Sequence, residues 1–166
     1  MSSLAAELKT LLLRRPRLTL AAAESLTAGH VQARIAAVSG SSAYFRGGVT
    51  AYALEEKVRL LGVDRAAAKK VNCVSAAVAE QMAVGALKLF RTDLAVATTG
   101  YAEPSPADGV TLPHAWWAVA WKRGRGRPRV RHGFVECLGA RRTDVQAIGA
   151  EAVLTELAAW LREERG

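Results

Sequence analysis

The chain has 166 residues, a formal net charge of +8, 51% hydrophobic residues and 23% charged residues. This composition fits a soluble globular chain, and the length favours one domain over residues 1–166. No apolar run is long enough to span a membrane. The cysteines, Cys73 and Cys137, are far apart and lack metal-ligand spacing. We therefore expect a reduced, cytoplasmic protein without a disulfide framework or a metal site.

The first part of the chain alternates between helical and strand patterns. Leucines at helical spacing with a glutamate among them indicate an amphipathic helix over 3–14, rather than a targeting peptide. A short apolar run over 18–23 suits a buried strand, and a helix follows to about residue 38. After a turn, residues 43–52 form a second strand region.

The later elements follow from the same patterns. The remaining helices are expected over 54–61, 65–71, 76–90 and 143–164, and the remaining strands over 93–98, 114–121 and 131–138. The apolar side of the third of these helices should carry Val78, Met82, Leu87 and Leu89, and that of the last Ile148, Val153, Leu154, Leu157 and Leu161. The alternation followed by a hairpin predicts an α/β fold, a three-layer α/β/α sandwich on a mixed, mostly parallel sheet.

Much of the positive charge lies in one basic run, residues 122–131. Such a run can neutralise nucleic-acid phosphates, but it is also typical of a solvated hairpin loop. No aromatic residue is interleaved with the charges as a single-strand platform would require. We therefore expect a loop and regard nucleic acid as an unlikely partner.

A polar turn over 24–29 follows the first strand. It places Ser25 at the carboxyl end of a strand, where ligands collect in open α/β sheets, and close to the start of a helix, which favours negative charge. Ser25 could attack a carbonyl whose oxyanion is held nearby. The alternative is that Ser25 or Thr27 only caps the helix.

Other polar side chains follow neighbouring strands. Tyr52 and Lys57 follow the second strand region, and Thr99 follows the strand over 93–98. A lysine beside Ser25 could act as a general base if burial or neighbouring positive charge lowered its pKa from about 10.4 toward about 7–8. The alternatives are a solvated surface lysine and a tyrosine in the core.

Four blocks of the sequence together resemble the CinA carboxy-terminal domain family. They are AESLTAG (23–29), GGVTAYALEEKVRLLGV (47–63), VSAAVAEQMAVGAL (74–87) and LAVATTGYAEP (94–104). The family includes the PncC-type nicotinamide mononucleotide deamidases. The resemblance implies an α/β/α sandwich, a homo-oligomer, no metal or other cofactor, and hydrolysis of a nicotinamide-nucleotide amide to the acid with release of ammonia.

The resemblance also implies roles for individual residues. Ser25 matches the nucleophile, Lys57 the general base, Tyr52 its partner, and Thr99 a residue beside the leaving amide or oxyanion. The family arginine falls on Arg141 or Arg142, because the GARR register is ambiguous, and it would meet the substrate phosphate or another subunit. The remaining substrate-binding positions are expected at Thr27, Gly29, Gly48 and Gly100.

The chain also departs from the family pattern. Leu26 replaces a cysteine, Ala28 replaces a glycine, and the glycine-rich loop reads GYAEPSP over 100–106, with Glu103 bringing negative charge. Trp116 and Trp117 replace another family segment and could stack on a ring or lie in the core. The alternative to the amidase is therefore an inactive paralogue that acts as a nucleotide-binding or interaction module.

Overall fold

A computed structural model describes residues 3–165. The helices are α1 (Leu4–Leu13), α2 (His30–Ala36), α3 (Leu54–Leu61), α4 (Arg65–Lys70), α5 (Ala76–Phe90) and α6 (Arg142–Arg165). The strands are β1 (Leu20–Glu24), β2 (Phe45–Thr50), β3 (Leu94–Tyr101), β4 (His114–Trp121) and β5 (Arg129–Glu136). Two short 3₁₀ helices cover Ser41–Ala43 and Pro106–Asp108.

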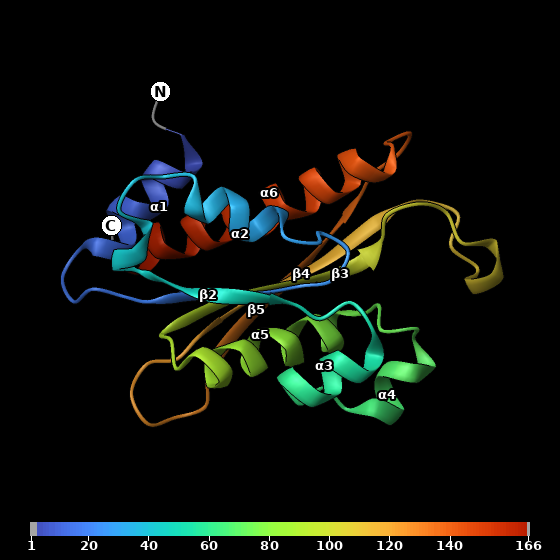
Figure 1. The fold of residues 1–166 in the computed structure, drawn as a ribbon, viewed down its shortest axis with the longest axis horizontal. Helices are drawn as coiled ribbons and strands as arrows, with labels where there is room; N and C mark the ends of the chain where they lie inside the picture. The colour runs from blue at the N-terminus through green and yellow to red at the C-terminus, as the bar shows by residue number, and fades with distance from the viewer. Residues whose placement is uncertain (1–2, 166) are drawn as a thin grey trace.

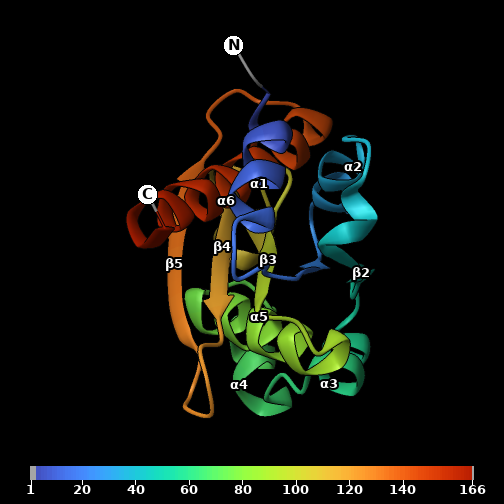
Figure 2. The same cartoon turned by 90° about the vertical axis from the view of Figure 1, so that its left-hand side faces the viewer.

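The strands form one mixed sheet in the order β2-β1-β3-β4-β5. β1 is parallel to both β2 and β3, whereas β4 runs antiparallel to β3 and to β5. Helices α1, α2 and α6 cover one face, and α3, α4 and α5 lie on the other (Figures 1 and 2). This confirms the expected α/β/α sandwich, and it brings the carboxyl ends of β1, β2 and β3 to one edge.

The central strands are apolar because both of their faces are covered. Every residue of β1 is buried, as are the first six of β3. Alanines of both strands pack under α5 in one core cluster, while leucine and valine side chains face α1 and α6 in another. Small side chains on the α5 face allow this helix to lie close to the sheet.

Close packing also fixes α3 against α5. A methyl group added at Gly85 of α5 would lie 2.1 Å from the backbone oxygen of Leu61 in α3, so only glycine fits there. This contact matters for the site, because α3 carries Lys57.

The expectation that Leu89 and Ile148 are core residues is wrong. Leu89 is 43% exposed and Ile148 is 37% exposed. The buried side of α6 contains Val145, Gly149 and Val153, and Ile148 lies outside that stripe. Leu89 borders an open cavity at the end of α5. No helix within residues 3–165 is long and apolar enough to cross a membrane.

The basic run is a hairpin loop for most of its length. It connects β4 to β5 and is solvent-exposed from residue 122 to residue 127. Its last part differs from the expectation, because β5 begins at Arg129 rather than at residue 131. Arg129 and Arg131 therefore lie on a strand, where their guanidinium groups stack on Trp160 of α6.

Candidate active site

A buried carboxylate organises the turn after β1. One oxygen of Glu24 accepts hydrogen bonds from the Thr27 hydroxyl at 2.6 Å, the Gly29 N–H at 2.9 Å and the Val31 N–H at 3.0 Å. The other oxygen accepts the Gln32 N–H at 2.9 Å. Glu24 is fully buried, so these four donors take the place of water around its carboxyl oxygens.

This arrangement corrects the alternative in which Ser25 or Thr27 caps the helix. α2 begins only at His30, and its N-cap residue, Gly29, has a left-handed φ of 105° and no side-chain cap. The Glu24 carboxylate instead binds the free N–H groups at the start of α2. The start of this helix is therefore already occupied, and Ser25 is free to make other contacts.

Ser25 and Lys57 meet at the carboxyl edge of the sheet. The Nζ of Lys57 lies 2.9 Å from the Oγ of Ser25. It also donates to the carbonyl oxygens of Ala51 at 2.8 Å and Tyr52 at 2.7 Å. Ala51 is itself held to β1, since its N–H donates to the Glu24 carbonyl. Lys57 is only 1% exposed, so the alternative of a solvated surface lysine is wrong.

The surroundings of Lys57 favour its neutral form. Burial lowers the pKa of the amine, and the neighbouring Cys73 acts weakly in the opposite direction. No carboxylate among residues 3–165 forms an ion pair with Lys57. A neutral amine has two N–H groups, which the two carbonyls accept, and one lone pair, which can accept the Ser25 hydroxyl proton. This geometry suits a serine activated by a lysine base.

Tyr52 and Arg142 line a small cavity that Leu26, the residue after Ser25, also borders, whereas Ser25 and Lys57 are not among its lining residues. Tyr52 is 55% exposed, so the alternative of a core tyrosine is wrong. The Arg142 guanidinium donates to the Tyr52 hydroxyl at 2.8 Å and to the Glu103 carboxylate at 3.1 Å. The cavity has a volume of about 230 Å³, and Leu26, Tyr52, Glu103 and Arg142 are among its lining residues.

The two candidate arginines occupy different positions. Arg141 points to Asp144 in the first turn of α6, and its side chain is 83% exposed. It is absent from the lining of the small cavity, whereas Arg142 belongs to it. The sequence register left the two open, and the structure places Arg142 at the cavity.

Thr27 and Thr99 are engaged in the protein interior. Thr27 is fully buried and bonds to Glu24 and to the Thr98 hydroxyl, so its side chain supports the turn. Thr99 donates to the Cys73 carbonyl oxygen at 2.7 Å. Each hydroxyl therefore holds segments around Ser25 together.

The predicted glycines have packing roles in the structure. A methyl group at Gly48 would lie 2.6 Å from the side chain of Gln32, and one at Gly100 would lie 2.2 Å from the His114 backbone oxygen. Gly29 provides the left-handed turn whose N–H binds Glu24. Ala28, at the family's glycine position, has a φ of 48°, which an alanine adopts less readily than a glycine.

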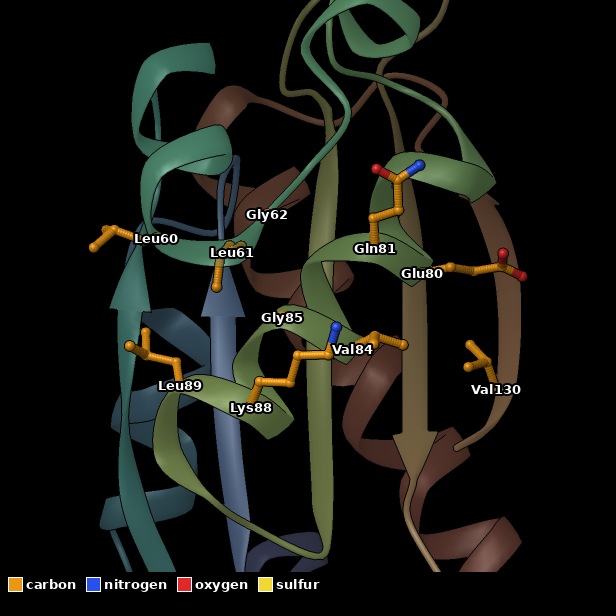
Figure 3. Close-up of a pocket in the computed structure, with 10 residues that line it drawn as sticks. All are labelled: Leu60, Leu61, Gly62, Glu80, Gln81, Val84, Gly85, Lys88, Leu89 and Val130. Atoms are coloured by element: carbon orange, nitrogen blue, oxygen red, sulfur yellow. The ribbon is translucent and has the colours of Figure 1, made fainter. Parts of the chain in front are cut away.

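The tryptophans and a larger cavity lie elsewhere. Trp117 packs beneath Gly133 on the α6 side, and Trp116 contacts Phe134 and His132. A cavity of about 580 Å³ lies among α3, α5 and β5, and Figure 3 shows the residues that line it. Two of its polar residues have partners, because Gln81 accepts from the Asp64 N–H and Glu80 contacts His132. The other charged residue of the lining is Lys88, and none of the predicted site residues lies there.

Sequence reasoning missed Glu24 and the segment around Cys73. A glutamate at the end of an otherwise apolar, buried strand was the available signal, because a buried carboxylate requires several donors. Asn72 and Cys73 have consecutive left-handed φ values of 47° and 62°. Asn72 donates to the Tyr101 hydroxyl, so this bend is tied to the loop after β3. Nothing in the local sequence pattern indicated that contact.

Comparison with known proteins gives one consistent result. The family profile of the CinA C-terminal domain matches residues 1–161. A CinA-like protein of Chlorobium limicola is 39% identical over 150 residues, which are 90% of this chain and 35% of that protein. The chain thus spans about a third of the length of this relative.

Solved structures agree with the profile match. A competence damage-inducible protein A from Klebsiella pneumoniae superposes with a TM-score of 0.83 at 29% identity, covering 96% of this chain and 95% of that one. A competence/damage inducible protein from Agrobacterium tumefaciens gives a TM-score of 0.82 at 27% identity, covering 98% and 99%.

Replacing Glu24 with glutamine should destabilise the fold by about 3 kcal/mol or more, because a neutral amide cannot accept all four hydrogen bonds. Urea denaturation measures this change. Glu151→Gln is the matched control: Glu151 is exposed and, within residues 3–165, forms an ion pair with Arg34 alone, so loss of its charge should cost less than about 0.5 kcal/mol. Equal effects of the two substitutions would contradict the assigned role of Glu24.

Proposed function

The chain belongs to the CinA C-terminal domain family, and from this premise we propose that it is an amidohydrolase that deamidates nicotinamide mononucleotide or a related amide. The observation that carries the proposal is the contact of 2.9 Å between the buried Lys57 amine and the Ser25 hydroxyl. Burying a lysine without a carboxylate partner lowers the stability of a fold. A role as the general base for Ser25 accounts for the burial of Lys57 at this position.

The proposed reaction proceeds in two stages. Ser25 Oγ attacks the amide carbon while its proton passes to the neutral Nζ of Lys57. The C–N bond then breaks, and Lys57 returns the proton to the departing nitrogen, which leaves as ammonia. Water attacks the resulting ester through the same base, releasing the acid and restoring Ser25.

A backbone donor is available for the developing oxyanion. The N–H of Leu26, the residue after Ser25, has no acceptor among residues 3–165, and Leu26 lines the cavity. A preorganised N–H at this position can stabilise negative charge on the former carbonyl oxygen. Tyr52 and Arg142 then form the part of the cavity that positions the substrate, with Arg142 directed to its phosphate.

The second candidate is an inactive member of the same family that binds a ligand without turnover. The observation that favours it is the Glu103–Arg142 ion pair, which already occupies the arginine proposed for the phosphate. In addition, a cavity of about 230 Å³ is smaller than the roughly 300–1,000 Å³ typical of small-molecule sites. A nucleotide would need Glu103 to release Arg142.

Ammonia release from nicotinamide mononucleotide tests the proposal directly. Ser25→Ala and Lys57→Ala should each lower kcat by about 10³-fold or more, because either change removes the activated nucleophile. Cys73→Ser is the control, since Cys73 lies near Lys57 but takes no part in the reaction. Turnover that persists in both variants would contradict the Ser–Lys mechanism, and binding by the parent without turnover would favour the inactive member.

The pH dependence of kcat should report the lowered pKa of Lys57. Protonated Lys57 cannot act as a base, so kcat should rise with pH and level off above a pKa that lies below the ordinary value of about 10.4. The free energy of unfolding should rise with pH between the lowered pKa of folded Lys57 and the ordinary lysine pKa of about 10.4, because in that range the unfolded chain retains a proton that the folded chain has lost. A rise in kcat centred at the ordinary lysine pKa, or one abolished in Cys73→Ser, would contradict this assignment.

Arg142 and Arg141 provide a matched pair for testing substrate binding. Arg142→Ala should raise KM for nicotinamide mononucleotide about tenfold or more, because a charge-assisted contact to phosphate is lost. Arg141→Ala removes the same charge outside the cavity and should change KM less than about twofold. Initial-rate kinetics separate the two, and an equal rise in both variants would indicate a general effect of charge.

A further inference from the structure

A second concave site lies at the opposite end of the sheet from Ser25. Three segments distant in sequence form it: the bend after α1 over 14–18, the start of the β4–β5 loop over 121–124, and the last turn of α6. Figure 1 shows the bend, the loop and the C-terminus at the end of the molecule opposite the loop that follows β3. The cavity has a volume of about 480 Å³.

The site carries an excess of positive charge. Its lining includes six cations, Arg14, Arg15, Arg17, Lys122, Arg123 and Arg165, and two carboxylates, Asp93 and Glu164. The carboxylates are already engaged: Glu164 pairs with Arg123 and Arg129, and Asp93 accepts from the backbone and hydroxyl of Thr19.

Five of these six cations, all except Arg123, pair with no carboxylate within residues 3–165. Arg15, Arg17 and Lys122 are three of them. Arg14 and Arg165 donate to backbone carbonyls of each other's segment, which orients them without neutralising their charge. Burial, together with the charges of Arg123 and Arg14, lowers the pKa of Arg165.

Two buried donors in the lining also lack an acceptor. The indole N–H of Trp121 and the Nη1 of Arg165 have no hydrogen-bond partner among the described residues. Trp121 is 2% exposed, and the Arg123 guanidinium lies over its ring at 4.4 Å from the centroid. These two donor atoms have almost no accessible surface, so the exposed cations of the lining provide the complement of an anion with several oxygen atoms.

We propose that this basic pocket binds a compact ligand with two or more adjacent phosphate groups, at a site separate from Ser25. The concave shape brings cations from three segments toward one small volume, which suits a polyphosphate chain. A nucleic-acid strand would instead favour an extended stripe with exposed aromatic rings for stacking, and Trp121 is too buried to offer one.

Calorimetric titration of the purified chain with tripolyphosphate tests the proposal, with ATP titrated in parallel. Arg15→Ser/Arg17→Ser removes two exposed, unpaired cations of the pocket and should weaken tripolyphosphate binding about tenfold or more. Lys69→Ser/Lys70→Ser is the matched control, because it removes two exposed charges from α4, outside this pocket, and should change binding less than about twofold.

The outcomes separate the possible origins of binding. Equal affinity for tripolyphosphate and ATP would support recognition of the phosphate chain alone, and tighter binding of ATP would support a nucleoside polyphosphate. No binding by the parent, or equal losses in the two double variants, would overturn the proposal. Binding of duplex DNA that depends on Arg15 and Arg17, without binding of tripolyphosphate, would also overturn it. Thermal unfolding of both variants confirms that they remain folded.

Discussion

The burial of one amine constrains the whole carboxyl edge of this sheet. Lys57 reaches Ser25 only because α3 packs closely on α5 and because Ala51 and Tyr52 present carbonyl oxygens to the same nitrogen. A lysine in this environment loses its hydration and gains no carboxylate partner. The fold therefore stabilises a neutral amine next to a hydroxyl, which is the chemical basis of the proposed amidase.

A second buried polar side chain, that of Glu24, makes this arrangement possible. Its carboxylate accepts hydrogen bonds from the N–H groups at the start of α2 and so holds the turn that carries Ser25. The Ser25 side chain is therefore not needed to cap α2. Its neighbour Thr27 is held between Glu24 and Thr98, which ties the turn to β3. The adjacent residues Glu24 and Ser25 thus have separate roles: Glu24 holds the turn, and Ser25 takes part in the proposed chemistry.

The two ends of the sheet differ in charge. The Ser25 edge contains a buried lysine amine, whose pKa is lowered by burial, and one arginine that is already paired with Glu103. The opposite end gathers six cations around a pocket with two engaged carboxylates. Part of the positive charge behind the net charge of +8 therefore lies at the end of the sheet opposite the proposed reaction site. A phosphate-bearing ligand at that end would be recognised independently of the amide substrate.

The sequence alone determined the α/β fold and the approximate limits of most elements, because hydrophobic periodicity is a local property, and it placed Ser25, Tyr52 and Lys57 after strands. The adjacency of those strands, on which the meeting of Ser25 and Lys57 depends, came from the tertiary structure. Only the tertiary structure decided that Lys57 is buried, that Tyr52 is exposed, that Glu24 caps α2 and that Arg142 rather than Arg141 faces the cavity. These outcomes depend on which side chains meet across α3, α5 and α6, and contacts between segments distant in the chain leave no local pattern in the sequence.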